Sequence, residues 1–107
     1  MCIRDRRLTR ADRGFVSLVV VLETVWVMES RYGADAATIS DTLQDLLQAP
    51  TLEVQEAAAV RDAVQRYRQG GVDLHDCLIV ALAATRKARV LTFDAKAARR
   101  PGMELLR

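Results

Sequence analysis

The strongest constraint in this sequence is a run of apolar residues that carries a single charge. Residues 15–28 read FVSLVVVLETVWVM, and Glu23 is the only charged residue among them. If the run forms a helix, Glu23 shares a stripe with Val20 and Trp26, and no Lys or Arg lies on that stripe. Burying an unpaired carboxylate costs more free energy than a small domain can lose, so such a group is normally paired, protonated or bound to a metal ion. Glu23 is therefore the first candidate for a functional site.

Length and composition restrict the class of protein. The 107 residues suffice for one domain but not for two, and 50% apolar with 28% charged residues is an ordinary globular balance. The apolar run is shorter than the roughly 18 residues of a membrane-spanning helix, and two cysteines are too few for a disulfide scaffold. His75 is the only histidine, so the sequence argues against a histidine-based zinc site and a Ser-His-Asp triad. We therefore expect a cytoplasmic protein with no membrane contact.

Helical and strand patterns alternate along the chain. The predicted helices cover residues 17–32, 35–48, 55–69, 73–87 and, more briefly, 94–99. Short apolar strands are predicted at residues 15–16, 51–54, 89–93 and 103–106. This alternation predicts an α/β fold around a parallel sheet, in one domain over residues 14–107. Residues 1–13 contain five arginines, and we expect a solvated basic tail there, with a nucleic-acid-binding arm as the alternative.

Acidic residues at four positions could share one site. They lie at the ends of predicted elements or in apolar surroundings: Glu23, Asp73, Asp76 and Asp94. Asp94 follows the strand VLTF, and ligands of open parallel sheets bind outside the carboxyl ends of the strands. Each aspartate also has an ordinary alternative role as a helix cap. Together the four predict a site for Mg²⁺ or Mn²⁺, which prefer oxygen ligands and neutralise carboxylates that come close together.

Basic residues border the predicted acidic site. They flank the VLTF strand on both sides: Arg86, Lys87, Arg89, Lys96, Arg99 and Arg100. Most clusters of this kind are solvated faces, and this is the first interpretation. The second is contact with the phosphates of a nucleic acid, with Arg86, Lys87, Lys96 and Arg99 as the candidate residues.

Three segments, in this order and spacing, resemble a known family. VSLVVVLETVWVM, DLHDCLIVALA and VLTFDAKAARRPGMELL are similar to PIN-domain ribonucleases and, more narrowly, to the VapC toxins of bacterial toxin–antitoxin pairs. The resemblance implies a three-layer α/β/α sandwich with a short parallel sheet and a cluster of acids that binds Mg²⁺ or Mn²⁺. It also implies hydrolysis of single-stranded or tRNA-like RNA, a homodimer and a cognate antitoxin.

The resemblance assigns roles to particular acids. Glu23 matches the acid of the first long helix, Asp76 the aspartate that precedes the buried helix, and Asp94 the aspartate after the late strand. These three are the implied catalytic residues and metal ligands. Asp73 matches a further acid with a supporting role near the metal.

The start of the chain departs from the family pattern. The family opens with a buried strand that ends in an aspartate, and residues 1–13 contain no apolar run of that kind. We therefore expect that the chain is truncated at its N-terminus, lacks one metal ligand, binds metal weakly and cleaves RNA poorly. One alternative is a catalytically impaired fragment that acts as a dimerisation or antitoxin-binding module. Another is a structural α/β fragment whose acids only cap helices.

Overall fold

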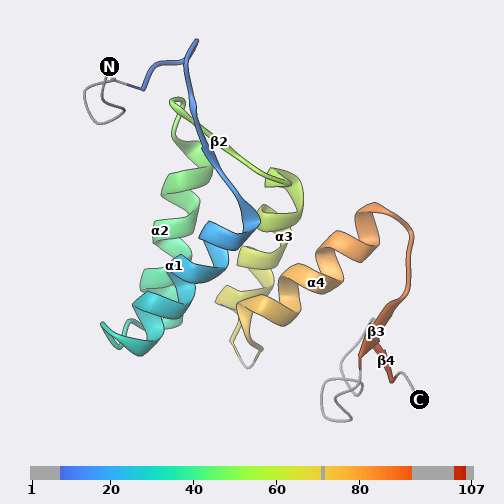
Figure 1. Ribbon diagram of the computed structural model, residues 1–107. Coiled ribbons are helices and arrows are strands. Elements are labelled where there is room, and N and C mark those ends of the chain that lie inside the picture. Colours follow the sequence, from blue (N-terminus) through green and yellow to red (C-terminus); the bar gives the residue numbers. More distant parts are fainter. Residues whose placement is uncertain (1–7, 71, 93–102, 106–107) are drawn as a thin grey trace. The chain divides into compact units, whose positions relative to one another are not determined.

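The computed structural model describes residues 8–70, 72–92 and 103–105 of the chain (Figure 1). The chain divides into two units, residues 1–57 and 58–107. Each unit contains one two-stranded sheet, and both sheets are parallel. Parallel strands require a crossover connection, which two helices provide in the first unit. The predicted α/β class with parallel pairing is confirmed.

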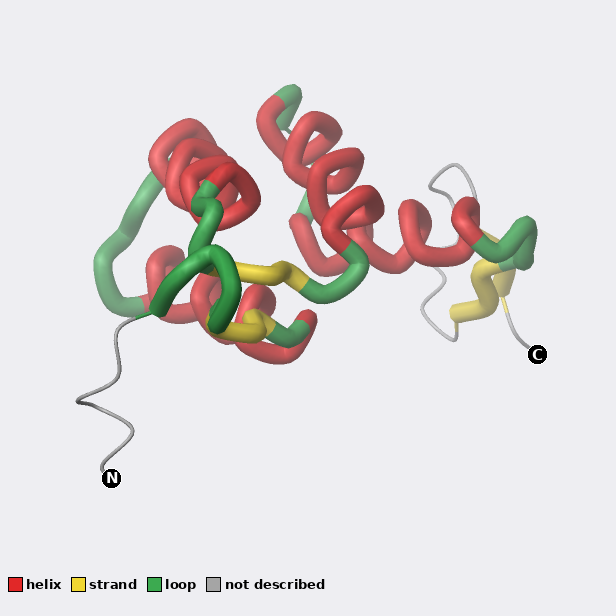
Figure 2. The backbone as a smooth tube through the Cα atoms, turned by 90° about the horizontal axis from the view of Figure 1, so that it is seen from above, coloured by secondary structure: helices red, strands yellow, loops and turns green. Residues whose placement is uncertain are grey.

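The first unit holds two strands and two helices in the order β1, α1, α2, β2. Their bounds are Gly14–Val16, Leu18–Ser30, Ala36–Gln48 and Leu52–Val54. Strands β1 and β2 pair with Phe15 opposite Glu53, and Figure 2 shows the two strands side by side in yellow. Helix α1 packs on α2, and α2 packs on β2. The buried apolar side chains of this unit are Val21, Val25, Ile39, Leu43 and Val54.

Side chains mark where both helices of the first unit begin. The Ser17 hydroxyl accepts a hydrogen bond of 3.2 Å from the Val20 N–H and caps α1. The Asp35 carboxylate accepts one of 2.8 Å from the Thr38 N–H and caps α2. Each cap satisfies a donor that has no partner inside its helix. Both helices thus begin where their sequences predict.

The second unit holds the remaining helices and strands. Their bounds are Ala57–Arg68 for α3, Leu74–Thr85 for α4, Val90–Thr92 for β3 and Met103–Leu105 for β4. Strand β3 pairs with β4, and Val90 packs against Ile79, Val80 and Ala83 of α4. Tyr67 is buried, as its sequence pattern predicts.

Some predicted bounds differ from the observed ones by one or two residues. Helix α1 ends at Ser30 rather than at residue 32, and α3 begins at Ala57 rather than at residue 55. Glu56 has a φ of 52°, a left-handed conformation that a helix cannot include, so the later start of α3 has a physical cause. The predicted short helix at residues 94–99 lies outside the described residues. Among the described residues, no helix is long and apolar enough to cross a membrane.

Candidate functional site

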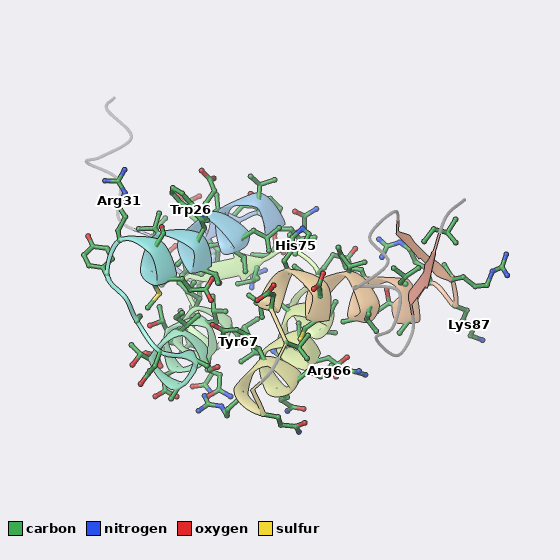
Figure 3. All side chains as sticks on the ribbon, turned by 90° about the horizontal axis from the view of Figure 1, so that it is seen from below. Trp26, Arg31, Arg66, Tyr67, His75 and Lys87 are labelled. Atoms are coloured by element: carbon green, nitrogen blue, oxygen red, sulfur yellow. The ribbon has the colours of Figure 1, made fainter. Side chains whose placement is uncertain are left out.

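Glu23 lies on the exposed side of α1. Its neighbours on that side are exposed as well, with Val19 at 65%, Val20 at 46% and Trp26 at 61% of their full surface. Trp26 projects from α1 on the side away from α2 (Figure 3). Trp26 does not anchor a core, because α1 buries only Val21 and Val25. We call Val19, Val20, Glu23 and Trp26 the α1 stripe.

Glu23 has no ion-pairing partner among the residues that the structure describes. Its carboxylate reaches solvent, which removes the penalty that a buried charge would carry. The expectation that Glu23 is a buried charge in need of a partner is therefore wrong, because a solvated carboxylate needs no cation to balance it. Its exposure leaves the carboxylate oxygens accessible from solvent.

Asp73 and Asp76 lie at the start of α4, one helical turn apart. Asp73 occupies the N-cap position, yet its side chain makes no capping hydrogen bond. Asp76 lies in the first turn, where the helix dipole favours a negative charge. The Asp76 side chain is 19% exposed, and its Oδ1 lies 3.8 Å from the Nδ1 of His75, whose side chain is 65% exposed. That distance is too long for a hydrogen bond, so His75 acts on Asp76 only through charge when it is protonated.

The proposed phosphate contacts divide into described and undescribed residues. Arg86 and Lys87 follow α4 and are exposed, whereas Lys96 and Arg99 lie outside the described residues, as does Asp94. The Arg86 Nη1 donates hydrogen bonds to the Leu82 carbonyl at 3.3 Å and the Thr85 hydroxyl at 3.2 Å. Arg86 thus closes the end of α4, a structural role that the sequence did not indicate.

Lys87 has a left-handed backbone. Its φ is 52°, and the Ala88 N–H donates to the Ala83 carbonyl at 2.9 Å. This geometry ends a helix in the way a glycine commonly does. The Lys87 side chain is exposed next to Arg86, so both remain candidates for phosphate contact.

The described metal-ligand candidates fall into both units of the chain. Glu23 belongs to the first unit, and Asp73 and Asp76 belong to the second. Within residues 8–70, 72–92 and 103–105, no three His, Cys, Asp or Glu side chains form a group that could hold a metal ion. The carboxylate oxygens of all three fit the donor preference of Mg²⁺ and Mn²⁺. Their convergence with Asp94 on one ion stays a prediction.

Two other titratable groups, Asp35 and Cys77, have shifted pKa values. The Thr38 backbone N–H, and then its side chain, lower the pKa of Asp35 by hydrogen bonding to the charged carboxylate. Burial raises the pKa of the Cys77 thiol, which is 4% exposed on α4. Cys77 is a small core residue of α4.

Sequence reasoning missed the role of Gln55. Its side-chain oxygen accepts a hydrogen bond of 2.9 Å from the Leu18 N–H, so a residue that follows β2 holds the start of α1. The two residues are 37 positions apart. No local pattern could reveal this contact, because it depends on the pairing of β1 with β2.

Comparison with known families gives one match. A family model described as PIN domain matches residues 3–103. The comparisons with curated proteins and with solved structures found no match.

Proposed function

The chain belongs to the PIN domain family, and from this we propose that it is a metal-dependent endoribonuclease of the VapC toxin type. PIN domains are generally nucleases, and they typically use divalent metal ions. The observation that carries the proposal is the PIN domain match over residues 3–103. Glu23 adds an exposed carboxylate with no ion-pairing partner among the described residues.

Four acids supply the proposed site. Glu23, Asp76 and Asp94 hold Mg²⁺ or Mn²⁺ through carboxylate oxygens, and Asp73 supports them from the N-cap position of α4. When bound, such an ion polarises a phosphate oxygen and lowers the pKa of a coordinated water molecule. The first turn of α4 fixes the backbone of Asp73 and Asp76, which limits the freedom that binding has to remove.

Basic residues complete the proposed substrate surface. Arg86 and Lys87 are exposed after α4, and with Lys96 and Arg99 they attract the phosphates of single-stranded or tRNA-like RNA. This attraction is electrostatic, so it weakens as the salt concentration rises. The proposed partners besides RNA are a cognate antitoxin and a second copy of the chain, in the cytoplasm.

RNA cleavage tests the proposal directly. A fluorescent single-stranded RNA is incubated with the protein in Mn²⁺, in Mg²⁺ and in excess chelator. We expect cleavage in either ion and none in chelator, because the proposed hydrolysis needs a bound divalent ion. Glu23→Gln should reduce the rate by at least about a hundredfold, the scale on which loss of a charge-stabilising group acts.

Two control variants show whether a lower cleavage rate comes from the loss of Glu23 itself or from the loss of one negative charge. Glu29→Gln removes the same charge from the exposed side of the same helix, and Asp45→Asn removes one from α2. Both should cleave like the unchanged protein. Cleavage that survives Glu23→Gln, or that does not depend on a divalent ion, would contradict the proposal.

A second function is favoured by the apolar part of the α1 stripe. Val19, Val20 and Trp26 are exposed together, and exposed apolar patches mark interaction surfaces. The alternative is therefore a catalytically impaired dimerisation or antitoxin-binding module. Sedimentation tests it, because Val19→Ser with Val20→Ser should weaken self-association, whereas the control Asp45→Asn on α2 should leave it unchanged. Association that survives this change would exclude dimerisation through the stripe.

A further inference from the structure

The first turn of α1 is held by two side chains of different origin. Ser17 Oγ accepts from the Val20 N–H at 3.2 Å, and it is a neighbour of α1 in the sequence. Gln55 Oε1 accepts from the Leu18 N–H at 2.9 Å, and it reaches α1 from the end of β2. The first contact stabilises the helix end, whereas the second also ties the helix to the sheet.

The backbone of Gln55 fixes where its side chain starts. The Gln55 N–H donates to the Val16 carbonyl at 2.8 Å, which continues the pairing of β1 with β2 by one residue. Glu56 then takes a φ of 52° and turns the chain into α3. Gln55 therefore holds both the end of β1 and the start of α1.

Water can replace part of this contact but not all of it. Gln55 is exposed, so a water molecule can accept from the Leu18 N–H once the side chain is removed. That water is not attached to β2. Loss of the Gln55 side chain should therefore change the stability of the fold little, and should change the orientation of α1 more.

Orientation matters because α1 carries Glu23. Glu23 lies five residues after Leu18, about 7.5 Å along the helix axis. A helix transmits a tilt of its first turn to the residues that follow. A displacement of about 1 Å at a catalytic or ligating group is enough to impair its function.

We propose that Gln55 is a positioning residue, whose side-chain oxygen sets the orientation of α1 on the β1–β2 sheet and with it the place of the Glu23 carboxylate. This inference rests on the proposed function only where it assigns a role to Glu23. The orientation of α1 is a property of the first unit alone.

Three variants test the proposal. Gln55→Met removes the acceptor at similar length, Gln55→Glu keeps an acceptor oxygen, and Ser17→Ala removes the other cap from the same turn. Residual dipolar couplings of the α1 amides, measured against those of β1 and β2 without metal, report the orientation. We expect Gln55→Met to change them, and Ser17→Ala and Gln55→Glu to leave them as they are.

A second readout connects orientation to ion binding. Trp26 is the only tryptophan and lies one helical turn from Glu23, so paramagnetic Mn²⁺ bound at Glu23 should quench its emission. Gln55→Met should raise the Mn²⁺ midpoint about tenfold, the scale reported for loss of a residue that orients a ligand. Gln55→Glu should restore it, and Ser17→Ala should leave it within twofold.

The two readouts separate the possible failures. If the unchanged protein shows no Mn²⁺ quenching, the proposed metal site fails, and the dipolar couplings still decide the role of Gln55. If Gln55→Met leaves the couplings unchanged, or changes them no more than Ser17→Ala does, the positioning role is overturned.

Discussion

Helices α1 and α4 are both apolar on nearly every side, yet they bury different shares of their surface. Helix α4 buries Leu74, Cys77, Leu78 and Ala81, and none of its large apolar side chains is exposed. Helix α1 buries two valines and leaves Val19, Val20 and Trp26 in solvent. An all-round apolar helix is usually a buried one, and α4 fits that expectation whereas α1 does not.

The difference follows the position of the acids. In α4 the carboxylates of Asp73 and Asp76 lie at the N-cap and in the first turn, where the helix dipole favours a negative charge. In α1 the carboxylate of Glu23 lies in the middle of the apolar run, and the whole stripe around it is exposed. In α1, the charged residue in the middle of the apolar run lies on the side of the helix that is exposed to solvent. Three sets of substitutions can break or sharpen this comparison.

The largest effect is expected in α4. Leu78 is 2% exposed, so Leu78→Ala should lower the free energy of unfolding by about 3 kcal/mol through lost burial and a cavity. Leu91→Ala is the matched control in β3, where the side chain is 53% exposed, and should stay within about 0.5 kcal/mol of the unchanged protein. Urea unfolding measures both. Equal losses would show that the Leu78 side chain is no better buried than that of Leu91.

The second effect compares the two sides of α1. Val21 is 1% exposed, and Val21→Ala should cost about 2 kcal/mol of unfolding free energy. Val19→Ala, on the α1 stripe, should be neutral or stabilising by up to about 0.5 kcal/mol, because alanine favours a helix more than valine does. A large loss for Val19→Ala would mean that the stripe is covered in the native protein.

The smallest effect compares two helix starts. The lowered pKa of Asp35 means that its carboxylate is more acidic folded than unfolded. Its contribution is therefore present above the unfolded pKa and is lost as the pH falls through the folded pKa. Asp35→Ala should lower the thermal midpoint at neutral pH, and the difference should shrink in acid. Asp73→Ala should change the midpoint less, because Asp73 makes no side-chain cap. A larger loss for Asp73→Ala would restore its role as a cap.

The sequence predicts local features better than distant ones. The caps at Ser17 and Asp35 and the bounds of α2 depend on neighbouring residues, and the structure agrees with them. The exposure of Trp26 was not predictable from the sequence. Helical periodicity shows which residues lie on the same side of a helix, but it does not show whether another element packs against that side. The Gln55 contact joins residues 37 positions apart and needs the strand pairing first. Glu23, Asp73, Asp76 and Asp94 could be proposed as one site because they are carboxylates at the ends of elements or in apolar surroundings, and Mg²⁺ and Mn²⁺ prefer oxygen ligands.

The central claim is the proposed role of Glu23 as a ligand of a divalent ion. Mn²⁺ titration of Trp26 emission tests it most directly in the unchanged protein, Glu23→Gln, Asp76→Asn and the control Asp45→Asn. We expect saturable quenching whose midpoint rises at least about tenfold in both Glu23→Gln and Asp76→Asn and stays unchanged in Asp45→Asn. A midpoint that Glu23→Gln leaves unchanged would contradict the proposed role of Glu23.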